Sequence, residues 1–182
     1  EINQSSLADI AFMLLIFFLV TTTMDVDSGI YRKLPAWVNE DQKPPDINER
    51  NVFVVGINLN NELFVEGAYA TIPELKDRVK EFIINPLQKD DLSEKETKFI
   101  EGLGDYDKSK GVVSLTNDRG TDYGSYIRVQ NELVAAFNEL RDEFCYAQFG
   151  MKFKALSVEL QEAVRLAIPT AISEAEPVEI KR

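Results

Sequence analysis

One carboxylate stands inside the most apolar stretch of the chain. The segment SSLADIAFMLLIFFLVTTTM, residues 5–24, carries Asp9 near its beginning and is uninterrupted apolar over residues 10–20. A charged aspartate at the centre of a bilayer costs about 2.5–3.5 kcal/mol on insertion scales, so a lipid-facing carboxylate must be protonated, paired or hydrated. Asp9 is therefore the residue of this segment whose type and position most need a functional explanation.

Helical spacing decides which side chains accompany Asp9. Residues three, four and seven positions apart share a helix face, and this face ends in polar groups, with an apolar stretch between them. Its polar members are Ser5, Ser6 and Thr23, and its apolar members are Phe12, Met13, Ile16 and Val20. Two interpretations stay open: the face is enclosed by other helices where water or a hydroxyl reaches Asp9, or Asp9 is solvated at headgroup level and complements the helix dipole.

The apolar segment itself favours a membrane-spanning helix. Counted from Leu7, its helical length approaches the roughly 30 Å hydrocarbon core. A signal peptide would need a basic region before the apolar run and small residues at a cleavage point, which Glu1 and TTTMDVD do not supply. A buried core helix would show a polar face. Because the chain opens on Glu1 rather than Met, we expect further residues before it.

The remaining residue types argue against enzymatic chemistry. The chain has no histidine and one cysteine, Cys145, which excludes a histidine acid or base, a Cys/His zinc site and an internal disulfide. Paired acids at residues 90–91, 105–107 and 174–176 lie in charge runs typical of solvated surface. We expect no enzyme activity, no metal and no cofactor, and Cys145 as a small buried side chain.

Charge excludes one class of partner. The chain has 31 acidic and 20 basic residues and a net charge of −11. Binding a phosphate backbone needs clustered lysine and arginine, and here the basic residues are scattered. We therefore expect no nucleic-acid binding.

Composition divides the rest of the chain. Residues 25–50 are polar and rich in proline, which predicts an extended linker, although GIYRKLPAW holds enough apolar side chains to dock; a solvated tether is the alternative. Residues 51–155 alternate strand and helix patterns: a strand, a tight turn at Asn60 and Asn61, a strand, a helix over 72–84 begun by Thr71, a strand over 112–118 and a helix over 126–144. A charged insertion covers about 85–110, with a short helix near 93–100. Residues 156–182 predict a C-terminal helix, interrupted at Pro169, and a tail.

The N-terminal motifs resemble those of a known family. Asn3, the acidic residue of LADI at the start of a single apolar helix, and the LP of RKLPAW resemble the ExbD/TolR family of biopolymer-transport proteins, in particular the longer versions of Bacteroidetes-type bacteria. The resemblance is close over the helix and linker, and over the rest of the chain it depends only on the pattern of predicted strands and helices.

The resemblance implies a fold. It is a single N-terminal transmembrane helix (1–24) plus a small α+β (β-β-α-β-α-β-like) periplasmic domain with a C-terminal helix. A final strand follows the last family helix, and CYAQFGMKF is the candidate here. Asp118, Asp122 and Tyr123 match an acidic and aromatic family pattern that we interpret as a fold signature. Leu34 and Pro35 are the expected linker docking residues.

The resemblance also implies a function. It makes Asp9 the proton relay of an inner-membrane motor driven by the proton-motive force. The implied partners are an ExbB-like channel pentamer, a second copy of the chain in a homodimer, membrane lipid, and a TonB-like protein reached across the periplasm. The recipient is left open among TonB, Tol and gliding-type systems. The alternative is a passive anchor whose outer domain binds peptidoglycan or envelope proteins.

Overall fold

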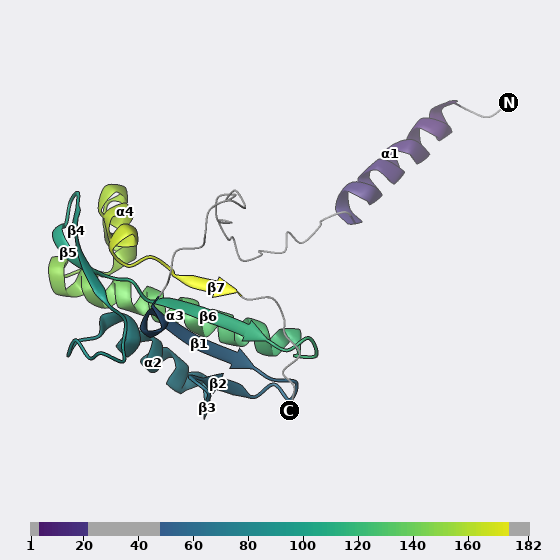
Figure 1. The fold of residues 1–182 in the computed structure, drawn as a ribbon. Coiled ribbons are helices and arrows are strands. Elements are labelled where there is room, and N and C mark those ends of the chain that lie inside the picture. Colours follow the sequence, from purple (N-terminus) through teal and green to yellow (C-terminus); the bar gives the residue numbers. More distant parts are fainter. Residues whose placement is uncertain (1–3, 22–47, 175–182) are drawn as a thin grey trace, which may run out of the picture. The chain divides into compact units, whose positions relative to one another are not determined.

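The computed structural model describes residues 4–21 and 48–174 (Figure 1). Contacts divide the chain into two compact units, Glu1–Pro44 and Pro45–Arg182. Each unit is described by itself.

The first unit contributes one helix, α1 (Gln4–Thr21). Its described side chains, from Leu7 to Thr21, are all exposed. At the C-terminal end the Thr21 hydroxyl donates to the carbonyl of Phe17 at 2.7 Å. Among the described residues, no helix meets the combined length and hydropathy expected of a membrane span.

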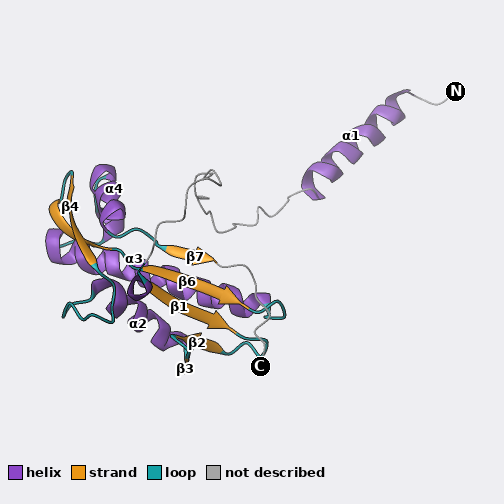
Figure 2. Cartoon of the chain, in the orientation of Figure 1, coloured by secondary structure: helices purple, strands orange, loops and turns teal. Residues whose placement is uncertain are grey.

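The second unit is a small α+β domain built on a mixed sheet (Figure 2). The sheet order is β3-β2-β1-β6-β7; β1 pairs in parallel with β6 and β6 with β7, whereas β1, β2 and β3 are antiparallel. The strands are β1 (Val52–Ile57), β2 (Leu63–Val65), β3 (Ala68–Ala70), β4 (Lys95–Ile100), β5 (Gly104–Ser109), β6 (Val112–Asn117) and β7 (Ile172–Glu174), and the helices are α2 (Ile72–Ile84), α3 (Tyr123–Phe149) and α4 (Val158–Ala167).

The predicted turn between the first two strands is confirmed. Asn61 adopts a left-handed backbone with φ 63°, a conformation that asparagine tolerates better than most residues. The Asn58 side-chain oxygen accepts from the backbone N–H of Asn60 and of Glu62, both at 2.9 Å. Local hydrogen bonding therefore fixes the register of the β1–β2 hairpin.

The core lies on one face of the sheet, under α2 and α3. Strand residues at alternating positions, such as Val55 and Leu115, are fully buried against helix residues such as Leu75 and Phe137. Alternate residues of a strand point to opposite faces, so the opposite face of the sheet, which includes Val54, stays partly open.

The helix α2 begins at its predicted signal, and α3 begins at Tyr123, three residues before its predicted start. At the start of α2 the Glu74 carboxylate accepts from the backbone N–H of Thr71 at 3.1 Å, and a proline occupies the first turn. Asp122 caps α3 by accepting from the backbone N–H of Ser125 at 3.1 Å. The interpretation of Asp122 as a fold signature agrees with this role.

Ion pairs join α2 to α3 along their length. The Lys76 ammonium lies 2.7 Å from a Glu139 carboxylate oxygen, and Lys80 pairs with Glu139 and Glu143. The hydrogen bond from Lys76 lowers the pKa of Glu139. Because these side chains are partly exposed, the pairs align the two helices more than they stabilise them.

The short helix predicted near residues 93–100 is wrong. The insertion instead forms an antiparallel hairpin, β4–β5, in a separate two-stranded sheet, with Lys95 opposite Ser109 and Ile100 opposite Gly104. The charge-rich composition resembled a solvated helix. Cross-strand pairing and burial of Ile100 against the domain decide the outcome.

The assignment of CYAQFGMKF as the final strand is also wrong. Residues 145–149 continue α3, where Cys145 is fully buried as predicted, and Gly150 ends the helix with φ 68°. The sheet's last strand is β7, much later in the chain. Its three residues are too short for alternation to be visible in the sequence.

The predicted C-terminal helix is present as α4, and it packs on its own domain. Val164 is fully buried in a second small cluster with Cys145 and Leu156. The buried guanidinium of Arg141 donates to the carbonyl of Ile168 at 2.9 Å and to the Thr170 hydroxyl at 2.7 Å. Arg141 thus fastens the segment that leads from α4 into β7.

We predict that Gly111→Ala destabilises the domain by about 1–3 kcal/mol, the usual cost of overpacking a core. A Cβ at Gly111 would lie 2.6 Å from a ring carbon of Phe82 and 2.9 Å from the Cβ of Ser93. Urea denaturation of the purified chain measures the change.

The matched control for this substitution is Gly56→Ala in β1. There the nearest atom to an added Cβ is the Phe64 Cβ at 3.9 Å, an ordinary contact. We expect a change of less than about 0.5 kcal/mol. Equal effects at the two glycines would contradict the close packing of Gly111.

Candidate functional site

Asp9 lies in the second turn of α1 and is exposed. A shallow groove of the helix surface brings it together with Met13, Ile16 and Phe17, and continues to Val20. The carboxylate therefore stands at one end of an apolar stripe, as the helical spacing predicted. No hydrogen bond or ion pair joins it to another described side chain.

The described part of α1 offers no second titratable side chain that could form a catalytic pair with Asp9. In a low-dielectric environment the ionised form of a carboxylate is strongly disfavoured.

The other predicted site residues are only partly covered by the structure. Ser5 and Ser6 lie within α1, but their side chains are not among the described ones. Thr23, Leu34 and Pro35 lie outside the described residues, as does most of the predicted linker. The support of the Asp9 face by Ser5, Ser6 and Thr23 and the docking role of Leu34 and Pro35 remain predictions.

Hydrogen bonds and an ion pair bind the first described residues of the second unit to the segment before β4. The Asn51 side chain accepts from the backbone N–H of Glu94 at 2.8 Å and donates to the Glu94 carboxylate at 3.3 Å. The same carboxylate accepts from Asn48 at 3.3 Å and lies 3.6 Å from the Arg50 guanidinium. Arg50 also donates to the carbonyl of Leu92 at 3.2 Å. We call Asn48, Arg50, Asn51 and Glu94 the joint.

Sequence reasoning missed the joint. Its two halves are more than forty residues apart in the chain, and each half consists of common polar residues in a charge-rich context. The hydrogen bond from Asn51, helped by the Arg50 charge, lowers the pKa of Glu94. The joint fixes the charged insertion to the segment through which the chain enters β1.

The open face of the sheet carries an aromatic pair. The rings of Phe64 and Tyr69, paired across β2 and β3, have centroids 4.3 Å apart. Tyr69 is 67% exposed, and Val54 on the neighbouring strand is 44% exposed. Exposed aromatic and aliphatic side chains together are typical of surfaces that bind other proteins.

Neither the joint nor the open face resembles a metal or catalytic centre. Within residues 4–21 and 48–174 no three cysteine or acidic side chains gather where they could hold a metal ion. Asp118, also interpreted as a fold signature, accepts from the backbone N–H of Gly120 at 3.2 Å within the turn before α3. The prediction that the chain is not an enzyme stays a prediction.

Comparisons with known proteins agree with the N-terminal motifs. The family described as "Biopolymer transport protein ExbD/TolR" matches residues 1–140, from before α1 to within α3. A comparison with curated proteins returned no match. The matched region contains Asp9, the joint and the open face.

We predict that Glu94→Gln lowers the urea concentration at the midpoint of denaturation at pH 7. On acidification this midpoint should then fall less in the variant than in the unaltered protein. The folded-state pKa of Glu94 is lowered from an unfolded value of about 4.3. Its contribution is therefore present above about pH 4.3 and is lost as the pH falls through the folded pKa. Denaturation curves between pH 7 and pH 3 measure both effects.

Glu96→Gln is the matched control for the joint. Glu96 lies in β4, two residues after Glu94, and pairs with Lys98 at 3.2 Å, on exposed side chains. We expect its curves to follow those of the unaltered protein. The joint loses its assigned role if both variants give the same acid dependence.

Proposed function

The chain belongs to the ExbD/TolR family of biopolymer transport proteins, and from this membership we propose that it is a motor subunit in which Asp9 relays protons. The family energises biopolymer transport. The observation that carries the finer proposal is the position of Asp9: one carboxylate at the end of an apolar stripe on α1. The proton-motive force is the energy source that such a group can use.

A comparison of two energies supports the proposal that Asp9 relays protons. Moving one charge across 100 mV corresponds to about 2.3 kcal/mol. Leaving an aspartate charged in the middle of a bilayer costs about 2.5–3.5 kcal/mol. The two energies are comparable, so arrival or departure of one proton can decide whether the Asp9 face lies against apolar or hydrated surroundings.

We place α1 in the inner membrane, with the second unit in the periplasm. The 18 residues of α1 give about 27 Å of helix at about 1.5 Å per residue, which is close to the roughly 30 Å thickness of the hydrocarbon core. Family membership supports the placement, since its members are inner-membrane proteins with a periplasmic domain.

The partners follow from the same reasoning. An ExbB-like pentamer around a homodimer of this chain would enclose two Asp9 faces in non-equivalent environments, and alternating protonation could then drive rotation. A TonB-like protein would receive the work. The open face with Phe64 and Tyr69 supports a protein-binding role for the outer domain.

We predict that Asp9→Asn leaves assembly with the channel partner intact and abolishes proton-dependent transport. Asparagine keeps the size and polarity of the side chain and cannot titrate. Asp9→Glu keeps a titratable carboxylate and should retain part of the activity. Co-purification measures assembly, and uptake with and without a protonophore measures coupling.

Thr21→Val is the control on the same helix, because it also removes a polar group, one bonded to the Phe17 carbonyl. We expect transport to persist in this variant. Unchanged transport in Asp9→Asn would reject the motor and favour the passive anchor, in which Asp9 affects only helix association and the outer domain binds peptidoglycan or envelope proteins.

A further inference from the structure

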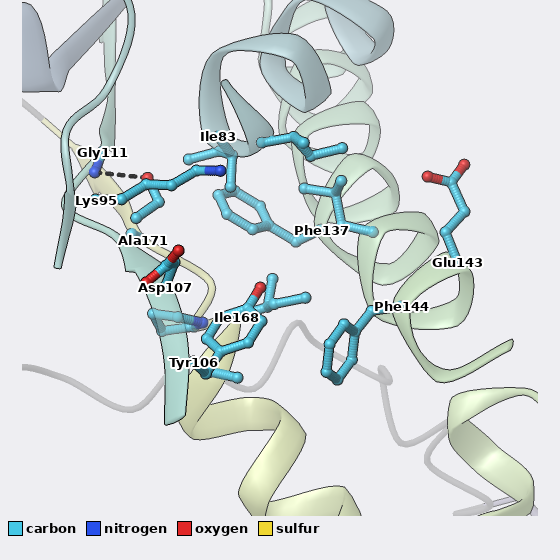
Figure 3. A pocket seen from close by; sticks show the side chains of 15 residues that line it. Ile83, Lys95, Tyr106, Asp107, Gly111, Phe137, Glu143, Phe144, Ile168 and Ala171 are labelled. Carbon is cyan, nitrogen blue, oxygen red and sulfur yellow. Dashed lines mark hydrogen bonds between the residues drawn. The ribbon is translucent and has the colours of Figure 1, made fainter. Parts of the chain in front are cut away.

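A cavity of about 230 Å³ lies where four parts of the second unit meet (Figure 3). Its walls come from the C-terminal end of α2, the second half of α3, the β4–β5 hairpin and the segment between α4 and β7. Most of the lining is apolar, with Ile83, Phe137, Phe144 and Ile168 prominent. Its lining includes none of the four joint residues and neither Val54, Phe64 nor Tyr69 of the open face.

Tyr106 brings a hydroxyl to this apolar space. Its ring packs edge-on against Phe144, with centroids 5.2 Å apart, and no hydrogen bond to the hydroxyl is present among the described residues. Burial, with a smaller contribution from the Asp107 charge, raises the pKa of Tyr106. The hydroxyl therefore keeps its proton at neutral pH and can donate it in a hydrogen bond.

Lys95 brings a positive charge to the same cavity. Figure 3 shows its side chain directed toward the cavity. Unlike Lys76, Lys80, Lys89 and Lys98, it forms no ion pair with a carboxylate in the described part of the chain. Its ammonium group remains available to an anion.

The acidic residues of the lining already have partners. Asp107 accepts from the Thr97 hydroxyl at 2.6 Å, and Glu143 pairs with Lys80. Among the described residues, Lys95 and Tyr106 are thus the donor side chains of the lining without a hydrogen-bond or ion-pair partner, and Asp107 keeps a charge that no ion pair neutralises there. Convergent donors at an apolar pocket favour a ligand that combines an anionic acceptor with a hydrocarbon body.

We propose that this cavity binds a small free carboxylic acid with an apolar body. The carboxylate accepts from the Lys95 ammonium and the Tyr106 hydroxyl, and the hydrocarbon lies against Phe137, Phe144 and Ile168. A volume of about 230 Å³ corresponds to the liquid volume of roughly eight water molecules at about 30 Å³ each, so the ligand is a small molecule of medium chain length.

Only part of the cavity lies beyond the family match. Phe144 and the segment 167–171 follow residue 140, where the match ends, whereas Lys95 and Tyr106 lie on the β4–β5 hairpin within the match. The ligand proposal uses no residue of α1, so it does not rest on the proposed motor.

The test uses the full chain in phosphatidylcholine nanodiscs, with octanoate and neutral 1-octanol as probes. Hydrogen exchange followed by mass spectrometry should show octanoate slowing exchange of amides in β5 and in residues 167–171, with no such effect of 1-octanol. Lys95→Met should raise the half-effective octanoate concentration about tenfold or more, because a hydrogen bond to a charged group contributes about 1.5–3 kcal/mol.

Two further variants sharpen the result. Tyr106→Phe keeps the ring contact with Phe144 and removes the hydroxyl, and it should raise the half-effective octanoate concentration severalfold. Lys98 lies on the same strand as Lys95 but does not line the cavity, so Lys98→Met should leave this concentration unchanged. The proposal is overturned if octanol protects as well as octanoate, if Lys95→Met has no effect, or if a peptide with an apolar C-terminus protects where octanoate does not.

Discussion

Burial of one face of the β1–β6 pair is the constraint on which the domain depends. Val55 and Leu115 are register partners in this parallel pair, and both are fully buried. Parallel strands cannot be joined by a tight turn, so the chain must leave and return, and here the connection contains β2, β3, α2 and the hairpin. The two helices α2 and α3 then cover the buried face, and the remaining strands extend the sheet.

The residue proposed to relay protons and the surface proposed to bind a protein belong to different units of the chain. Asp9 lies on α1, whose described side chains are all exposed. The folded domain has a satisfied core and ordinary surface carboxylates. In the proposed motor, energy enters through α1 and leaves through a protein contact of the domain. Work passing along the linker would reach the domain next to the joint, where Asn51 and Glu94 bind each other through both side chain and backbone.

The later segments add a second layer of packing to the family fold. Cys145, Leu156 and Val164 form a small cluster beyond the main core, and the buried Arg141 binds the chain that returns to β7. A buried guanidinium needs its donors satisfied, so this return path is closely specified. The cavity lies where this return path and the β4–β5 hairpin both meet α3.

The sequence by itself determined the apolar helix with its lone carboxylate, the first hairpin turn at Asn60 and Asn61, the start of α2 at Thr71, and the family. Each depends on local chemistry: backbone conformation, capping or helical spacing. Tertiary structure decided that residues 95–109 form a hairpin, that α3 continues through Cys145 to Phe149, and that β7 closes the sheet. Those outcomes depend on contacts between segments far apart in the chain, such as Asn51 with Glu94 and Arg141 with Ile168, whose energies no local pattern encodes.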